Sequence, residues 1–428
     1  MEVNINSVKP QLNGHIDIGR DDDSLENLYT CNAMEATNLK IVFTSDDLNK
    51  NCTKRLFKPE LVHQIFGINE IIFGYRNIVV NIYVTANSAQ YFIEVKYKAM
   101  IDSSKGLSPD NILERLALWL PAKYYTDRKQ FIRVIERENH SQMFGSVVDT
   151  FETYNKSENA TYKYIITNCS ASEKGFAEFH LRFECMIVWF IDAASQIDVD
   201  DPNWIFLYVF EERTLPNGKT GYYPVGYCTI YKFFHFPDKI RTRISQLFVI
   251  PPCQRTGVGT KLLSATYKVI TELPNVIDIT VEDPCEAFKK MRDTLDCQLL
   301  MQIESFKYPA ISKGFTQDMF TEANYHYKLN KQQCRRIYEI LRMVYITQYP
   351  NSDEAQKFYN EIKQRVEAPY QREQRNWKKK GIISSLSPNK DCFIYQTCIA
   401  KKDECSKDVM SYIHDIKSFA LNLHSKLY

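Results

Sequence analysis

The sequence predicts an α+β fold with a mixed, mostly antiparallel sheet, flanked by a smaller mixed domain and a helical C-terminal part. Two observations support this prediction. The middle of the chain carries two strand-like runs joined by a turn, then a strand, a glycine turn, a helix and a further strand. That order is typical of antiparallel strands followed by one βαβ crossover. The last third shows helical periodicity instead.

The size and charge of the chain limit its organisation and its partners. A chain of 428 residues is long for one hydrophobic core, so we expect two or three domains. Hydrophobic residues make up 44% of it, which is enough to build their cores. The net charge of +2 gives no basic excess of the kind that DNA-binding domains show, so we expect no direct nucleic-acid partner.

The sequence indicates neither a membrane anchor nor a metal site. The N-terminal stretch "MEVNINSVKPQLNG" lacks the charge pattern of an export signal, and the longest strongly apolar run, "CMIVWFI", is far shorter than a membrane span. The 12 cysteines are scattered, without a CxxC pair or nearby histidines at metal-ligand spacing. We therefore expect a reduced intracellular protein that holds no metal.

Three predicted domains follow from the pattern of strands and helices. Residues 1–140 contain alternating runs such as "IVVNIYVTA" (78–86), which predict half-buried strands, followed by a helical stripe, "NILERLALWL". Residues 141–300 contain the central pattern, beginning with a helical stretch over 176–195. Residues 301–428 are predicted to be helical, with an N-cap at Asn330 and a basic stretch, "QREQRNWKKK".

The segment "IPPCQRTGVGTKLL" (250–263) joins the third central strand to its helix and admits several interpretations. A P-loop is disfavoured, because lysine and threonine do not follow the second glycine in the required order. A dinucleotide fingerprint lacks its third glycine, although Asp278 keeps this alternative open. A glycine turn without a ligand also fits. The fourth interpretation is a Q-x-x-G-x-G loop whose N–H groups bind a pyrophosphate at a helix N-terminus.

The following strand, "VIDITVEDP", ends in two adjacent carboxylates, Glu282 and Asp283. Presenting a neutral lysine amine at pH 7 costs about 4.6 kcal/mol, because its reference pKa lies well above the medium. A positioned carboxylate can remove that proton during the reaction. The alternative is that the pair merely ends a strand in solvent.

Several segments, taken in order, resemble the catalytic subunits of type B histone acetyltransferases, which belong to the GCN5-related N-acetyltransferase (GNAT) superfamily. The segments are "HQIFGINEIIFGYRN", "WFIDAASQIDVDDPNW", "VGYCTIYKFFHFPDKIRTRISQLFVIPPCQRTGVGTKLL", "LPNVIDITVEDP" and "NKQQCRRIYEILR". The similarity extends from about residue 57 to about residue 370. It implies a GNAT fold for the central domain and acetyl-CoA as co-substrate.

The resemblance also implies roles for individual residues. Glu282 matches the general base, with Asp283 beside it, and Asp192 matches a further active-site acid. The stretch matching the pantetheine strand and the pyrophosphate loop comprises Leu247, Phe248, Val249, Gln254, Arg255, Thr256, Gly257, Val258, Gly259 and Thr260. The residues that match histone-tail contacts are Ile68, Asn69, Glu70, Tyr231, Lys232 and Phe233.

The chain departs from the family pattern at three of these places. Arg255 replaces the first loop glycine and adds a cation near the expected phosphates. Asp192 replaces a glutamate, so its carboxylate reaches one methylene less far. Ile68 and Asn69 replace acidic residues, which leaves Glu70 as the charged member of that contact.

The resemblance implies direct transfer of acetyl to lysines in the N-terminal tail of newly made histone H4. It also implies a WD-repeat histone chaperone of the retinoblastoma-binding type as partner, and a nuclear and cytoplasmic location. Two alternatives stay open from the sequence. One is an acetyltransferase of the same superfamily that acts on another amine, and the other is a histone-binding module without catalysis, which would not need Glu282.

Overall fold

The structure is a computed structural model that describes residues 28–49, 55–102, 106–138, 142–155, 159–215, 218–348, 350, 352–379 and 393–427. Lys380, the end of the predicted basic stretch, lies outside these ranges. Across the described part of the chain, no helix is both long enough and apolar enough to cross a membrane.

The chain folds into two compact units that each use several segments of the sequence. The first unit comprises Met1–Phe144, Ala171–Asp200 and Glu212–Pro224, and the second comprises Gly145–Ser170, Asp201–Glu211 and Val225–Tyr428. The domain boundaries predicted near residues 140 and 300 separate domains with different expected functions. These boundaries stay predictions.

The first unit has a three-stranded sheet covered by a helix. β2 (Thr37–Val42) pairs in parallel with β5 (Val79–Thr85), which pairs antiparallel with β6 (Tyr91–Lys96). Helix α5 (Arg128–Arg137) is amphipathic, so it buries Phe131 against this sheet. The strand predicted over 78–86 is present as β5, whereas the strand predicted over 91–101 ends at Lys96, and Ala99–Met100 form a separate short strand.

The other elements of the first unit are short. They are β1 (Thr30–Asn32), α2 (Ala33–Ala36), η1 (Ser45–Leu48), α3 (His63–Phe66), β3 (Ile71–Phe73), β4 (Tyr75–Arg76), β7 (Ala99–Met100), α4 (Ile112–Ala117), α6 (Phe176–Glu184) and η3 (Cys185–Trp189). The helix predicted over 176–195 therefore ends at Glu184 and tightens into a 3-10 turn. The run "CMIV" has no polar face, and all four side chains are buried.

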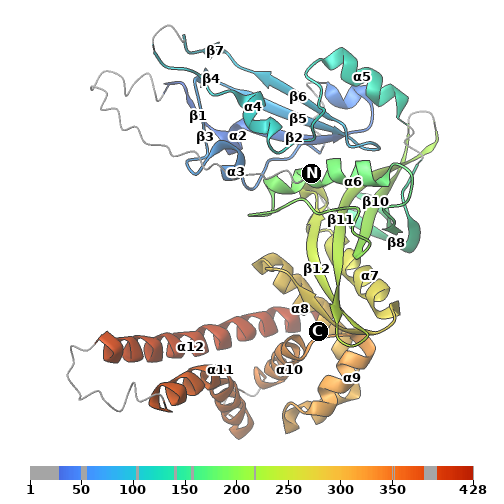
Figure 1. The fold of residues 1–428 in the computed structure, drawn as a ribbon. Coiled ribbons are helices and arrows are strands. Elements are labelled where there is room, and N and C mark those ends of the chain that lie inside the picture. The colour runs from blue at the N-terminus through green and yellow to red at the C-terminus, as the bar shows by residue number, and fades with distance from the viewer. Residues whose placement is uncertain are drawn as a thin grey trace. The chain divides into compact units, whose positions relative to one another are not determined.

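The central sheet has six strands in the order β13-β12-β11-β10-β9-β8. Their bounds are β8 (Ser146–Asn155), β9 (Ala160–Cys169), β10 (Trp204–Thr214), β11 (Thr220–His235), β12 (Lys239–Val249) and β13 (Val276–Val281). β11 and β12 are antiparallel, whereas β12 and β13 are parallel. This mixed sheet confirms the predicted α+β class (Figure 1).

The predicted βαβ crossover is present in the second unit. Helix α7 (Val258–Glu272) connects β12 to β13 and buries an apolar face that includes Leu262, Leu263 and Ile270. Helix α8 (Glu286–Leu300) follows β13 and packs against α7. The glycine segment therefore opens a helix directly after a strand and a short 3-10 turn, η4 (Pro251–Cys253), as its pyrophosphate interpretation requires.

The C-terminal part is helical, as predicted. It comprises α9 (Gln317–Tyr327), α10 (Lys331–Ile346), α11 (Asp353–Lys379) and α12 (Phe393–Leu427), with η5 (Glu304–Phe306) and η6 (Ala310–Lys313) before them. The Asn330 side chain accepts a hydrogen bond from Gln333 N–H, which confirms the predicted N-cap. α12 packs against both α10 and α11 (Figure 1).

The outer edge of β13 is covered by the chain that leads from α9 into α10. Ile279 N–H donates to Lys328 O at 2.8 Å, and Asn324 Nδ2 donates to Ile277 O at 2.7 Å. Asn330 Nδ2 reaches Ile279 O at 3.0 Å. These bonds satisfy backbone groups that an edge strand would otherwise leave open.

Candidate active site

The candidate active site lies in the second unit, where β12 and β13 separate. Their parallel ladder ends at the pair Ile244 and Val281, while β12 continues to Val249. Glu282 is the next residue after that pair, and its N–H donates to Ile244 O at 2.9 Å. Because β13 stops there, the Glu282 side chain is exposed at the opening of the sheet.

A β-bulge on the other side of β12 lies at the same level. Thr229 of β11 pairs with Gln246, but Ile230 pairs with Ile244, so Ser245 is the extra residue of the bulge. The Ser245 Oγ donates to Glu282 Oε2 at 2.7 Å. Ser245 could not be identified from the sequence, because an alternating strand pattern contains no sign of where a bulge falls.

Asp283 completes the predicted carboxylate pair in an unusual backbone conformation. Its φ is 31°, a positive value that residues with a side chain rarely adopt. Like Glu282, its side chain is exposed. Earlier in β13, Asp278 binds Arg241 of β12 through two hydrogen bonds of 2.7 and 3.0 Å, which fixes the register of the two strands below the carboxylates.

The predicted pantetheine strand is the last part of β12. Leu247, Phe248 and Val249 pair with Cys228, Tyr227 and Gly226 of β11. Gly226 lies so close to this segment that a Cβ there would be 2.3 Å from Phe248 O. Only glycine therefore allows β11 to support β12 at this level, beyond the end of β13.

The predicted pyrophosphate loop, Gln254 to Thr260, runs from η4 into the first turn of α7. Gln254 Nε2 donates to Val249 O at 2.9 Å, and Thr256 Oγ1 donates to Cys253 O at 2.7 Å, so the loop is fastened to the end of β12. Gly257 is the N-cap of α7 with a φ of 92°. The first N–H groups of a helix lack carbonyl partners within the helix, which suits an anionic ligand.

Arg255 also has a left-handed backbone, with a φ of 61°. Glycine, which the resemblance implies for this position in the family, adopts such a conformation without strain. The Arg255 side chain is exposed. The substitution thus places a cation on the loop at some cost in backbone strain.

The predicted tail-contact stretch Tyr231 to Phe233 lies on β11, which β12 separates from the strand that carries the carboxylates. The Tyr231 hydroxyl donates to Asp201 Oδ2 at 2.9 Å, and this bond raises the pKa of the tyrosine. The Tyr231 ring lies between Trp204, with centroids 4.8 Å apart, and Phe233, at 4.6 Å. The position of Trp204 and Asp201 beside Tyr231 could not be predicted from the sequence.

Two predicted site residues of the first unit are brought together by a histidine. His63 Nε2 lies 3.0 Å from Asp192 Oδ1, and its Nδ1 lies 3.9 Å from Glu70 Oε1. Glu70 ends a turn in which Ile68 is 92% exposed. His63, Glu70 and Asp192 therefore form one polar cluster, and His63 is not among the predicted site residues.

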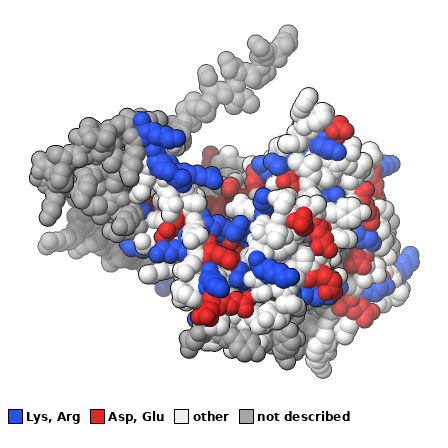
Figure 2. All heavy atoms as spheres, turned by 90° about the horizontal axis from the view of Figure 1, so that it is seen from below, with Lys and Arg blue, Asp and Glu red and all other residues white. Residues whose placement is uncertain are grey.

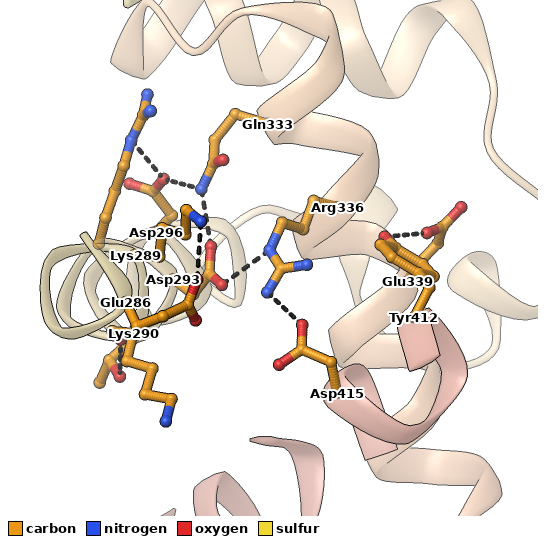
Figure 3. Close-up of polar contacts among 12 residues, drawn as sticks. Glu286, Lys289, Lys290, Asp293, Asp296, Gln333, Arg336, Glu339, Tyr412 and Asp415 are labelled. Atoms are coloured by element: carbon orange, nitrogen blue, oxygen red, sulfur yellow. Dashed lines mark hydrogen bonds and ion pairs between the residues drawn. The ribbon is translucent and has the colours of Figure 1, made fainter. Parts of the chain in front are cut away.

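A cavity of about 1210 Å³ lies beside the end of β13, between α8, α10 and α12. Its walls carry many charges, but the cations have partners. Arg336, for example, bridges Asp293 and Asp415 at 2.8 and 2.9 Å (Figure 3). The face of the molecule in Figure 2 likewise shows basic and acidic side chains interspersed, without a broad patch of one sign. The cavity is therefore no open anion site.

Behind β13, a buried polar cluster connects the sheet to the helices. Arg292 donates to the Tyr267 hydroxyl at 2.9 Å and to Ile279 O at 3.3 Å, and Asp296 accepts from Gln333 at 2.8 Å. Burial raises the pKa of Asp296 to about 6. The described residues contain no group of three or more histidine, cysteine, aspartate or glutamate side chains that could hold a metal ion.

Three family descriptions match successive parts of the chain. Residues 29–192 match "Histone acetyl transferase HAT1 N-terminus", residues 177–285 match "Acetyltransferase (GNAT) family", and residues 292–343 match "Histone acetyltransferase type B catalytic subunit, C-terminal". The GNAT match contains β10 to β13, the glycine loop and Glu282.

Whole-chain comparisons agree with these matches. A Homo sapiens protein named "Histone acetyltransferase type B catalytic subunit" is 33% identical over 349 residues, covering 81% of this chain and 82% of the relative. The chain belongs to the family of histone acetyltransferase type B catalytic subunits. A Mus musculus member is 33% identical over 81% of this chain and 83% of its own length. A Cryptococcus neoformans member is 26% identical over 72% and 82%.

Membership of the type B family confirms the resemblance, the GNAT fold and the enzyme class inferred from the sequence. The chain is a histone acetyltransferase, and its GNAT domain implies the use of acetyl-CoA. The assignment of individual residues rests on other grounds, namely the motif positions and the geometry described above. Those roles, the histone substrate and the partner stay predictions.

Proposed function

We propose that the enzyme acetylates lysine side chains in the N-terminal tail of histone H4, with Glu282 as the general base. The position of that carboxylate is the main support. Glu282 follows β13 at the point where β12 and β13 separate, and a serine of β12 holds one of its oxygens. A carboxylate that merely ended a strand in solvent would not require this contact.

The reaction needs a neutral amine. Lysine is protonated near pH 7, so a proton must leave the nitrogen before or during attack on the thioester carbonyl. A C–N bond forms and the C–S bond breaks, and the ammonium loses two protons in all: one goes to the base and the other protonates the departing thiolate, so coenzyme A leaves as its thiol. Glu282 is the group that accepts the amine proton, directly or through a water molecule, while Asp283 adds negative charge beside it.

The co-substrate is expected along the end of β12 and the N-terminus of α7. N–H groups of Leu247 to Val249 would bind the pantetheine arm, and those of Gln254 to Thr260 would bind the pyrophosphate. The two segments are joined by the Gln254 side chain, which bonds Val249 O. N–H groups directed at the thioester oxygen would stabilise the charge that develops during attack.

The substrate tail is expected at the Tyr231 to Phe233 stretch, with Ile68, Asn69 and Glu70 as further contacts. The carboxylate of Asp201, which accepts from Tyr231, adds negative charge that suits a basic peptide. Asp192 is proposed as a supporting acid. We also propose that the enzyme binds a WD-repeat histone chaperone. We expect it to act on histones in both nucleus and cytoplasm, before chromatin assembly.

The test is acetylation of free core histones with acetyl-CoA, mapped by mass spectrometry. Glu282→Gln should lower the rate by about 10² to 10⁴, the range for loss of a general base. Glu286→Gln is the matched control, because Glu286 is an exposed carboxylate four residues later that pairs with Lys289. Wild-type rates for Glu282→Gln would rule out this base.

The same assay separates the alternatives. If the wild-type enzyme leaves the H4 tail unmodified but acetylates other peptides of a panel, the substrate assignment is wrong and the chemistry stands. If it binds histones and acetyl-CoA without transferring acetyl, the non-catalytic alternative holds. Acetylation at H4 tail lysines supports the proposal.

A further inference from the structure

We propose that Ser245 is a positioning residue for the base: its hydroxyl holds the Glu282 carboxylate in the orientation that accepts the proton. This inference rests on the proposed role of Glu282. It adds a residue of β12 that neither the motifs nor the family resemblance indicated.

The backbone places the two residues side by side. Ile244 and Val281 are the last pair of the parallel β12–β13 ladder, so Ser245 and Glu282 are the next residue on each strand. In a parallel sheet, such neighbours direct their side chains to the same face. The bond from Glu282 N–H to Ile244 O holds the backbones at this level.

A β-bulge lies at Ser245, between the pairs Thr229–Gln246 and Ile230–Ile244. Because Ser245 is the inserted residue, it is released from the regular β11 pairing. Bulges commonly redirect a side chain beside an active site in this way.

The hydrogen bond itself selects one geometry of the carboxylate. Ser245 Oγ lies 2.7 Å from Glu282 Oε2, a short distance typical of a hydroxyl bonded to a charged acceptor. Glu282 is exposed, so a glutamate without this bond would sample several rotamers. In the proposed step the Glu282 carboxylate accepts the amine proton, and Ser245 keeps its own proton throughout.

The first experiment compares Ser245→Ala and Ser245→Thr in steady-state acetylation of an H4 tail peptide. We expect the alanine variant to lose about tenfold in kcat, in line with a hydrogen bond to a charged group. KM for acetyl-CoA should not change, because the cofactor segments are untouched. The threonine variant keeps the hydroxyl and should recover most of the rate.

A matched control removes a different hydroxyl from the same pair of strands. Thr280 Oγ1 donates to the backbone oxygen of Thr242 at 2.9 Å, so its hydroxyl bonds β12 and not a carboxylate. Thr280→Val should therefore keep the wild-type kcat. Thermal unfolding of all variants shows whether a lower rate reflects loss of folded protein, and equal melting temperatures with a lower kcat for Ser245→Ala support positioning.

A double-mutant cycle separates this inference from the proposed function. If Ser245 acts through Glu282, Ser245→Ala should have no further effect on kcat in a Glu282→Gln background. An equal tenfold loss in both backgrounds, or no loss in the wild-type background, would overturn the role of Ser245 and leave Glu282 as base. Wild-type activity of Glu282→Gln would instead overturn the base and, with it, this inference.

Discussion

Asp192 Oδ1 lies 3.0 Å from Nε2 of His63, 129 residues earlier in the chain. The other ring nitrogen lies 3.9 Å from Glu70 Oε1, so one imidazole lies between two carboxylates for which the family resemblance implies functional roles. We expect His63→Ala to raise KM for a histone tail peptide about fivefold, equivalent to roughly 1 kcal/mol for an exposed polar contact.

Two controls accompany the His63 prediction: a kinetic constant that should not change, and a second histidine variant. KM for acetyl-CoA should stay constant, since the predicted cofactor loop belongs to the other compact unit. His326→Ala is the control, because His326 is an exposed histidine of α9. An unchanged KM for the peptide in His63→Ala would show that the cluster does not contribute to tail binding.

Arg255 combines a positive φ with a charged side chain, and the two effects can be separated. Arg255→Gly should raise the free energy of unfolding by about 1 kcal/mol, because glycine tolerates this backbone conformation. It should also raise KM for acetyl-CoA several-fold at low salt, where a cation near phosphates has most effect. Denaturant unfolding and steady-state kinetics measure the two quantities.

Arg255→Ala distinguishes charge from strain at that position. Alanine removes the cation and keeps the strained φ, so KM should rise as in the glycine variant while stability should not. If KM for acetyl-CoA is the same in all three proteins, the arginine does not contact the co-substrate.

Arg336 joins α8 and α12 through Asp293 and Asp415 (Figure 3). Asp293 is 2% exposed, so Arg336→Met would leave a buried carboxylate without its charged partner. We expect a loss of about 3 kcal/mol in the free energy of unfolding, as for other buried ion pairs that lose one member. Asp415→Asn, at a side chain 45% exposed, should cost under about 1 kcal/mol. Equal losses in a urea titration would contradict this order.

His180 makes the first unit sensitive to acid. Burial lowers the pKa of His180 from 6.5 to about 3. Below pH 6.5 the unfolded chain binds a proton that the folded state does not, so stability is intact above pH 6.5 and falls as pH decreases toward 3. Between pH 6.5 and 5 the loss should reach about 2 kcal/mol.

A neutral replacement isolates that contribution. His180→Leu should unfold with a free energy that changes about 2 kcal/mol less between pH 7 and pH 5 than that of the wild type. Its stability at pH 7 serves as the baseline for each protein. The same pH dependence in both proteins would show that His180 does not titrate in this way.

Much of the fold was predictable from local pattern. The strands and helix between residues 225 and 284 alternate at the correct periods, and Asn330 caps its helix as its residue type suggests. The hairpin β8–β9 was not predicted, because β8 contains no buried side chain and therefore no apolar stripe. α12 has weak amphipathicity, and its contacts come from α10 and α11, which a local pattern does not contain.

The candidate site, like the fold, contains some features that the sequence indicated and others that it did not. Residue types in the loop and at the end of β13 indicated a phosphate site and a base. The contact between Ser245 and Glu282 depends on a bulge, and that between His63 and Asp192 on residues far apart in sequence. Both are consequences of tertiary packing, so no reading of neighbouring residues could reveal them.

The covered edge of β13 has a consequence for incomplete chains. Lys328 O and the Asn324 and Asn330 side chains occupy the outer backbone groups of that strand. A product that stops after α8 would keep the whole GNAT sheet but would present an open strand edge beside Glu282. Open edges recruit strands from other molecules, so such fragments should aggregate instead of working as minimal enzymes.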